Sequence, residues 1–246
     1  MSQEKRIALV TGASRGIGRA LALELAQDNA HVIALARSQE KLEALDDEIQ
    51  ALGGTATLAP CDITDYAALD RLGATIFERW GKLDVFVGNA AILGPLSPLA
   101  HVEPKDWDRV MAVNVTANWR LIRSLDPLLR NSGQARVAFL TSGVAHRADM
   151  KPFWGPYAIS KAALEALART YAAETRGDGV TVMLASPGPL RTQMRAQAMP
   201  GEDPQILKTP EEFAKKCLAL LKPEWQESAR LYDFVADKLR DFKSPN

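Results

Sequence analysis

Short apolar runs alternate with longer amphipathic segments along most of the chain. The apolar runs are rich in Val, Ile and Leu, and they predict buried strands near residues 6–11, 31–36, 55–60, 83–89, 136–142, 180–186 and 230–236. Helix patterns lie between them, near residues 17–28, 39–52, 65–79, 105–131, 156–176 and 210–221. This alternation predicts a doubly wound α/β (Rossmann) fold, with a parallel seven-stranded sheet and helices on both of its faces.

Composition limits the class of protein without identifying it. The 246 residues are 47% hydrophobic and 24% charged, and no linker or repeat interrupts them, so we expect a single domain over residues 1–246. Lys and Arg (30) balance Asp and Glu (30), which argues against a nucleic-acid or membrane partner. No apolar stretch is long enough for a signal peptide or a membrane span, and two distant cysteines suit a reducing compartment, so we expect a cytoplasmic protein. The three histidines lack metal-ligand neighbours at suitable spacing, and we expect no metal site.

A glycine-rich turn, TGASRGIGRA, follows the first predicted strand and leads into a helix. Gly12, Gly16 and Gly18 allow the backbone to turn tightly and to approach a pyrophosphate, while the amides at the start of the helix attract negative charge. The spacing differs from the usual dinucleotide fingerprint, and a corner that simply requires glycine remains the alternative. The flanking strand and helix favour a cofactor site.

The end of the second predicted strand bears on which dinucleotide binds. Enzymes that prefer NAD usually place an acidic residue there, but this chain has Ala36 followed by Arg37. Arg15 in the glycine turn adds a second guanidinium, and two such groups suit a phosphate monoester. We therefore expect NADP, with the alternative that both arginines are ordinary surface residues.

A tyrosine and a lysine, Tyr157 and Lys161, are four residues apart at the start of a predicted helix. That spacing places a phenol and an ammonium group on the same helix face. A solvated surface contact would explain the pair, and so would a phenol whose proton becomes labile beside a fixed cation. The two residues alone do not decide between these alternatives.

From about Arg6 to about Thr192 the chain resembles the short-chain dehydrogenase/reductase family in its single-domain form. The motifs that carry the resemblance stand in order: TGASRGIG at 11–18, CDIT at 61–64, GNAA at 88–91, Asn114 in VNV, Ser142 in LTSG, Tyr157 with Lys161 in YAISK, and PGPLRT at 187–192.

The resemblance implies catalytic roles for four of these residues. Tyr157 would be the general acid in carbonyl reduction and the base in the reverse direction, with its pKa lowered by Lys161 and an oxidised nicotinamide. Lys161 would also hold the nicotinamide ribose, and Ser142 would bind the substrate oxygen. Asn114 would hold a water that links Lys161 to solvent, although a helix-interior asparagine that faces water is the alternative.

The resemblance also implies cofactor contacts along the motifs. Asp62 would position the adenine, and Thr192 with the Leu190 backbone would meet the nicotinamide carboxamide, although Asp62 and Thr192 also suit a helix cap or a turn. The full set of expected cofactor-binding residues is Gly12, Ser14, Arg15, Gly16, Ile17, Gly18, Arg37, Asp62, Ile63, Asn89, Ala90, Ala91, Tyr157, Lys161, Pro187, Gly188, Leu190 and Thr192.

The expected substrate walls are residues 91–99, 143–155 and a lid at about 190–208, all rich in apolar side chains, so we expect an apolar carbonyl compound or alcohol. These side chains could equally pack on one another. We expect His146 to be a solvated loop histidine rather than a second acid, and Arg147 is another charge in this region.

Two other functions stay open. One is reduction of a 3-oxoacyl thioester on a carrier protein, with Arg120, Arg123 and Arg130 as candidate docking residues, and the other is a non-catalytic NADP sensor. Alanines recur at helical spacing in YAISKAALEALARTYAAE and leave a low-relief face that another helix can approach. The family resemblance implies that this helix and the one near 105–131 pair across a two-fold axis, so we expect a homodimer or homotetramer. The Gly88 in GNAA, where relatives carry asparagine, and the missing glycine pair near the end are departures from the family, and the second makes a tetramer contact through the final strand doubtful.

Overall fold

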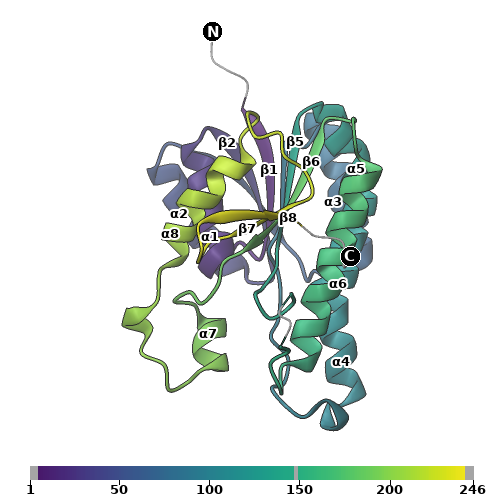
Figure 1. Ribbon diagram of the computed structural model, residues 1–246. Coiled ribbons are helices and arrows are strands. Elements are labelled where there is room, and N and C mark those ends of the chain that lie inside the picture. The colour runs from purple at the N-terminus through teal and green to yellow at the C-terminus, as the bar shows by residue number, and fades with distance from the viewer. Residues whose placement is uncertain (1–4, 147–148, 242–246) are drawn as a thin grey trace.

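The strands form one sheet, and all of them run parallel except the last (Figure 1). The computed structural model describes residues 5–146 and 149–241. The strands are β1 (Arg6–Thr11), β2 (Ala30–Ala36), β3 (Thr55–Pro60), β4 (Val85–Gly88), β5 (Ala135–Leu140), β6 (Val180–Ser186), β7 (Arg230–Asp233) and β8 (Lys238–Asp241). Their order across the sheet is β3-β2-β1-β4-β5-β6-β7-β8.

Helices connect the strands and cover both faces of the sheet (Figure 1). The α-helices are α1 (Gly16–Gln27), α2 (Gln39–Ala51), α3 (Tyr66–Trp80), α4 (Pro104–Met111), α5 (Ala117–Ser132), α6 (Gly155–Glu174), α7 (Gln193–Ala198) and α8 (Pro210–Leu218). Shorter turns of helix are η1 (Leu99–His101), η2 (Ala112–Thr116), η3 (Pro204–Ile206) and η4 (Ala219–Leu221).

Side chains along the parallel strands alternate between two separate cores. In β1, Ala8 and Val10 pack in the core under α1, α2 and α8, whereas Ile7 and Leu9 pack in the core under α3, α5 and α6. Because successive strand residues point to opposite faces, a strand covered on both sides must be apolar at every position. This requirement produces the continuous apolar runs, and each fully buried Leu or Ile contributes about 1.5–3 kcal/mol.

The direction of winding reverses between β1 and β4. The chain first builds outward from β1 to β3 and then crosses back to place β4 on the other side of β1. Ligands of doubly wound sheets bind at such a switch point, beyond the carboxyl ends of the strands. Here the two strand ends are joined directly, because the Thr11 hydroxyl accepts hydrogen bonds from the amides of Asn89 and Ala90, each at 3.0 Å.

The sheet has eight strands rather than the expected seven. The additional strand, β8, pairs antiparallel with β7 and places Arg230 opposite Asp241. Ion pairs hold the two strands together, with Arg230 Nε 3.1 Å from Asp241 Oδ1 and Arg240 Nη2 2.6 Å from Asp233 Oδ2. A strand secured by charges has no apolar alternation, which explains why its pattern does not predict it.

The helix expected over residues 105–131 is interrupted. The α-helical hydrogen bonds of α4 and α5 give way to a turn of π-helix, η2, which contains Asn114. Such single-turn bulges are often found at functional sites. The expected lid over residues 190–208 also contains regular structure, since α7 begins directly after Thr192 and η3 follows it.

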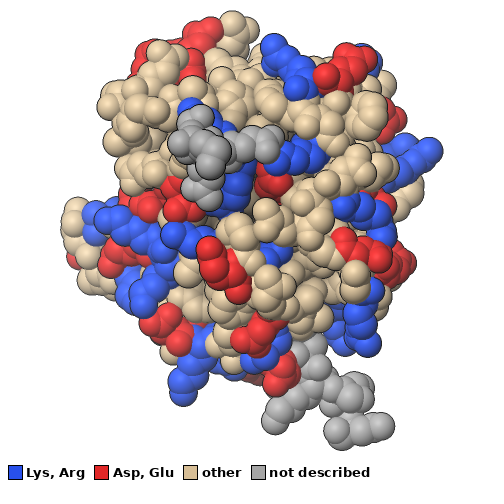
Figure 2. All heavy atoms as spheres, turned by 90° about the horizontal axis from the view of Figure 1, so that it is seen from above, with Lys and Arg blue, Asp and Glu red and all other residues tan. Residues whose placement is uncertain are grey.

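Charges on the surface are mixed in sign. Basic and acidic side chains are interspersed on the face shown in Figure 2, where no large patch of one sign is seen. Within the described residues, no helix combines the length and apolarity that crossing a bilayer requires.

Candidate active site

The glycine turn leaves no room for a side chain at Gly18. A Cβ on Gly18 would lie 2.3 Å from the Gly12 carbonyl oxygen and 2.5 Å from Asn89 Nδ2, so a side chain would force the turn and the β4 loop apart. Gly12 and Gly16 have φ of +66° and +55°, in the left-handed region that favours glycine. The glycines therefore bring the start of α1 against the switch point.

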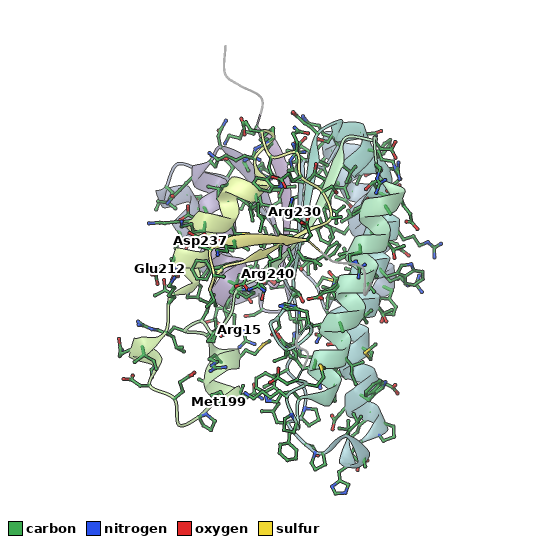
Figure 3. All side chains as sticks on the ribbon, in the orientation of Figure 1. Arg15, Met199, Glu212, Arg230, Asp237 and Arg240 are labelled. Atoms are coloured by element: carbon green, nitrogen blue, oxygen red, sulfur yellow. The ribbon has the colours of Figure 1, made fainter. Side chains whose placement is uncertain are left out.

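The start of α1 has the chemistry of an anion site. Within the described part of the chain, the N-cap residue Arg15 makes no side-chain capping hydrogen bond, which leaves the first amides of the helix to other partners. Ser14 and Ile17 lie in the same turn, and Arg15 is its exposed residue. In Figure 3 Arg15 lies between the glycine turn and α7, where its guanidinium hydrogen-bonds the Gln193 side chain.

Arg37 and Asp62 follow the ends of the neighbouring strands β2 and β3. The Cys61 amide donates to the Ala36 carbonyl at 2.9 Å, which ties the two strand ends together. Hydrogen bonds from the Thr64 amide and hydroxyl hold the pKa of Asp62 below its usual range, with smaller contributions from Arg37 and Arg109. Asp62 thus forms the local turn that was its alternative interpretation, while Ile63 beside it is buried.

The loop after β4 is organised around Asn89. Its Nδ2 donates to the Thr11 carbonyl at 2.8 Å, and Ala90 and Ala91 continue along the same side of the switch point. Gly88, one of the departures from the family motif, has a structural reason. A Cβ there would lie 2.5 Å from the Phe139 ring and 2.6 Å from Asn118 Oδ1, so these two side chains occupy the space.

Tyr157 and Lys161 lie in the first two turns of α6, which begins at Gly155. Both are buried, at 9% and 2% exposure, and Lys161 Nζ is 5.9 Å from the centre of the Tyr157 ring. The pair is therefore not the solvated surface contact that the sequence left open. Lys161 Nζ donates to the Leu140 carbonyl at 2.7 Å, which fixes the ammonium at the end of β5.

Burial controls the protonation of both groups. It raises the pKa of Tyr157 to about 12, and only a hydrogen bond with the Ser142 hydroxyl opposes this rise. It lowers the pKa of Lys161 to about 8, against the opposing charge of Glu165. The pKa of Tyr157 is therefore raised, whereas the expectation was that Lys161 lowers it. The reason is that the loss of solvation around a buried phenolate has a larger effect on this pKa than the other groups of the protein have.

Asn114 is fully buried in the π-helical turn and does not face water. Its side chain accepts from the Ile92 amide at 2.9 Å, and it donates to the Ile92 carbonyl at 3.0 Å and to Ser160 Oγ at 2.9 Å. The backbone carbonyl of Asn114 accepts a hydrogen bond from Asn118 Nδ2 at 2.9 Å. Asn114 thereby joins α6 to the loop that follows β4.

The PGPLRT segment leads from β6 into the lid. Pro187 is buried, Gly188 adopts a φ of +68°, and Leu190 bridges to Lys208 at the far end of the lid. The Thr192 hydroxyl caps α7 by accepting from the Arg195 amide at 3.2 Å, as its alternative interpretation anticipated. Its methyl group lies near Gly16, so the lid begins beside the glycine turn.

An apolar cluster surrounds the Tyr157 ring. It contains Leu93, Trp154, Tyr157, Ala158 and Ala198, with Val144, Met194 and Met199 packed against it. The Trp154 ring meets Tyr157 edge to face at 6.1 Å, and Lys151 Nζ covers the Trp154 ring at 4.4 Å. Figure 3 shows Met199 at the far end of α7 from Arg15. Arg147 lies outside the described residues.

Two hollows lie on the surface, one beside the expected site residues and one away from them. A cleft of about 460 Å³ separates the loop after β4 from α7, and Arg15, Ala91, Leu93 and Met194 are among the residues that line it. A larger hollow of about 950 Å³ lies at the amino ends of β5 and β6, at the opposite end of the sheet. None of the expected site residues lines the larger hollow, whereas Arg15 and Ala91, two of the expected cofactor-binding residues, line the smaller cleft.

One cluster in the site was not anticipated. His146 Nδ1 lies 2.9 Å from Glu165 Oε1, and the same oxygen accepts from the Thr141 hydroxyl at 2.5 Å. The expectation that His146 is merely solvated is therefore wrong. Glu165 follows Lys161 by four residues and has apolar neighbours in the sequence. This spacing could have predicted that Glu165 lies on the buried face of the helix.

Comparison with known proteins identifies the family. The family model of the short chain dehydrogenase matches residues 6–203. The chain therefore belongs to the short-chain dehydrogenase/reductase family, in agreement with the resemblance of its motifs.

Three similar proteins cover most of the chain. The uncharacterized oxidoreductase YciK of Escherichia coli K12 is 37% identical over 227 residues, which span 88% of this chain and 86% of that protein. The NADPH-dependent pterin aldehyde reductase of Arabidopsis thaliana is 32% identical over 224 residues, or 88% of this chain and 87% of that protein. A solved short chain dehydrogenase of Shigella flexneri 2a complexed with NADP has a TM-score of 0.88 and 35% identity, and the match covers 94% of this chain and 97% of that chain.

Proposed function

We propose that this protein is an NADP(H)-dependent oxidoreductase that reduces an apolar ketone or aldehyde, with Tyr157 as the proton donor. The observation that carries the proposal is the buried Tyr157, hydrogen-bonded to Ser142 beside Lys161, at the switch point of a dinucleotide-type fold. We also propose that residues 190–208 act as the substrate lid of a single catalytic domain.

The residues around the switch point suit NADP. The Gly12–Gly18 turn admits a backbone approach to a pyrophosphate, and the uncapped start of α1 supplies amides for it. Arg15 and Arg37 are exposed where the 2′-phosphate of the adenosine ribose would lie, and no carboxylate takes the place of Ala36. NADP is also the cofactor in the Shigella flexneri structure, and the Arabidopsis thaliana relative is named for NADPH.

When bound, the reduced nicotinamide supplies the hydride, and the protein supplies the proton and the orientation. The Ser142 hydroxyl orients the substrate oxygen and polarises the carbonyl. Tyr157 donates its phenolic proton to that oxygen, and a pKa near 12 keeps the proton on the phenol at neutral pH. The Lys161 ammonium stabilises the resulting phenolate, and its bond to the Leu140 carbonyl keeps it in position.

The wall around Tyr157 favours an apolar substrate. Trp154, Met194 and Met199 contribute aromatic and thioether surfaces to this wall, and the Lys151 ammonium lies over the Trp154 ring and beside the Met199 sulfur. The carrier-protein alternative receives less support. Arg130 is already paired with Asp126 and Asp178, and the Arg120 guanidinium stacks 5.0 Å from the centres of the Tyr66 and Trp119 rings.

The test is oxidation of NADPH by the purified protein over a panel of aromatic, aliphatic and charged carbonyl compounds. Tyr157→Phe should lower kcat at least about 100-fold, because it removes the proton donor and keeps the ring. Tyr66→Phe is the matched control, since its ring contact with Arg120 lies on α3 away from the cleft. Near wild-type turnover by Tyr157→Phe would reject the assigned acid, and NADPH binding without turnover on any compound would favour the sensor alternative.

A further inference from the structure

Three consecutive residues at the end of β5 each bond to one residue of α6. The Leu140 carbonyl accepts from Lys161 Nζ, the Thr141 hydroxyl donates to Glu165, and the Ser142 hydroxyl bonds Tyr157. Their α6 partners are four residues apart and so lie on one face of the helix. The Leu140 and Ser142 contacts belong to the proposed chemistry, but the Thr141 contact with Glu165 has no part in it.

Glu165 is a buried acid with a defined set of partners. It is 7% exposed, and its Oε1 accepts from Thr141 Oγ1 at 2.5 Å and from His146 Nδ1 at 2.9 Å. Since a carboxylate can only accept, the proton of the His146 pair is on Nδ1. The 2.5 Å bond is in the range of a hydroxyl that donates to a charged acceptor. One carboxylate thus joins α6 to the end of β5 and to the loop that follows it.

We propose that Glu165 is a positioning residue, whose carboxylate fixes the end of β5 and the following loop against α6 and so holds Leu140 and Ser142 in place for Lys161 and Tyr157. The inference rests on the proposed function for the roles of Tyr157 and Lys161. A second consequence is electrostatic, because the negative charge of Glu165 favours the ammonium form of the buried Lys161. Among the described contacts of Glu165, the titratable groups are His146 from the loop and Lys161 from its own helix. The residue directly after β5, Thr141, contributes only its hydroxyl.

Two substitutions separate the two effects. Glu165→Gln retains an oxygen acceptor and removes the charge, whereas Thr141→Val removes the hydroxyl and keeps both the volume and the charge. The control is Glu174→Gln, which makes the same change at an exposed position of the same helix. All variants are compared by melting temperature before any other measurement.

The first measurement is independent of turnover. Lysine side chains are labelled with ¹³C and ¹⁵N and titrated by NMR, and the Lys161 signal is assigned by its loss in Lys161→Arg. In Glu165→Gln the Lys161 inflection should move down by about 0.5–1 pH unit, because the ammonium loses a nearby negative charge. Glu174→Gln should titrate as the wild type does. An unmoved inflection in Glu165→Gln overturns the proposal, whether or not any carbonyl compound is turned over.

The second measurement uses steady-state rates. Both Glu165→Gln and Thr141→Val should lower kcat about five- to tenfold with the KM for NADPH within about twofold. The first variant replaces charge-assisted hydrogen bonds with weaker neutral ones and the second removes a hydrogen bond, so both loosen the alignment of the reacting groups and leave the nucleotide contacts intact. Lower melting temperatures with unchanged kcat at 10 °C would mean that Glu165 only stabilises the fold, and this outcome overturns the proposal. If Glu165→Gln does not fold, Thr141→Val decides, because the Lys161 signal must move when its Leu140 acceptor is displaced.

Discussion

Burial gives Tyr157 and Lys161 unequal tendencies to ionise. The phenol keeps its proton at neutral pH, while the ammonium group begins to lose its own near pH 8. A proton donor that is reliably protonated suits reduction, in which the substrate oxygen must gain a proton. The reverse direction needs the phenolate, and that form requires a positive charge beyond what the described residues supply.

Arg37 carries the residue-scale prediction for the cofactor. Arg37→Asp should raise the KM for NADPH at least about tenfold and change the KM for NADH no more than about twofold, because the substitution replaces a guanidinium partner of the 2′-phosphate with a repelling carboxylate. Steady-state kinetics with both nucleotides measure the difference. Arg176→Asp, at an exposed position at the far end of the molecule, is the control. Equal effects of Arg37→Asp on the two nucleotides would contradict a phosphate contact.

The sequence predicts individual site residues where a local pattern reveals their environment. Each of three patterns can be recognised within a stretch of ten residues. They are the glycines in a strand-to-helix turn, an arginine at a position where an acidic residue would indicate NAD, and a tyrosine four residues before a lysine. The pairing of Glu165 with Thr141 and His146 joins residues 24 and 19 positions apart, and no local pattern specifies it. Asn118 is a similar case, since its buried Oδ1, which has no hydrogen-bond partner among the described residues, fills the space left by Gly88.

At the scale of elements, apolar periodicity predicts the helices and strands that pack in the two cores. It does not predict elements that ion pairs or altered backbone hydrogen bonds stabilise. Strands β1 to β7 and the helices that cover them are found because each buries a face. The hairpin of β7 and β8 is held by ion pairs of Arg230 with Asp241 and of Arg240 with Asp233, and Figure 3 shows Arg230 and Arg240 near these two strands. The π-helical turn at Asn114 leaves no signature because it changes hydrogen bonding without changing which residues are apolar.

The lid carries the element-scale prediction. Arg195 and Glu202 form two hydrogen bonds of 2.5 Å that close the chain between α7 and η3 into a loop. Glu202→Gln should raise the KM for the carbonyl substrate about two- to fivefold and leave the KM for NADPH nearly unchanged, since a partly exposed pair contributes modestly and the lid borders the substrate wall. Kinetics beside the control Glu78→Gln on α3 test this expectation. A matching rise in the NADPH KM would instead assign the pair to cofactor binding.

At the scale of the whole molecule, the sheet edge and the outer helices offer different surfaces to a second copy. The exposed edge is β8, and its Lys238, Arg240 and Asp241 are exposed charges of the kind that discourage pairing between sheets. Helices α4, α5 and α6 lie together along one side of the molecule (Figure 1). On this side Trp119 of α5 is 46% exposed, and the exposed positions of α6 include Ala166 and Ala173.

We therefore expect a homodimer through α5 and α6 rather than a tetramer extended through the sheet. An exposed aromatic side chain on α5 and small exposed residues on α6 permit close helix packing across a two-fold axis, whereas a charged antiparallel edge resists it. Sedimentation velocity at micromolar concentrations should give the mass of two chains, and Trp119→Glu should give the mass of one, because the substitution places a charge at the centre of the contact. Leu52→Glu, at a similarly exposed apolar position directly after α2, is the control and should remain dimeric. A wild-type mass of one chain at every concentration would exclude the dimer, and a mass of four chains that survives Trp119→Glu would place the contact elsewhere.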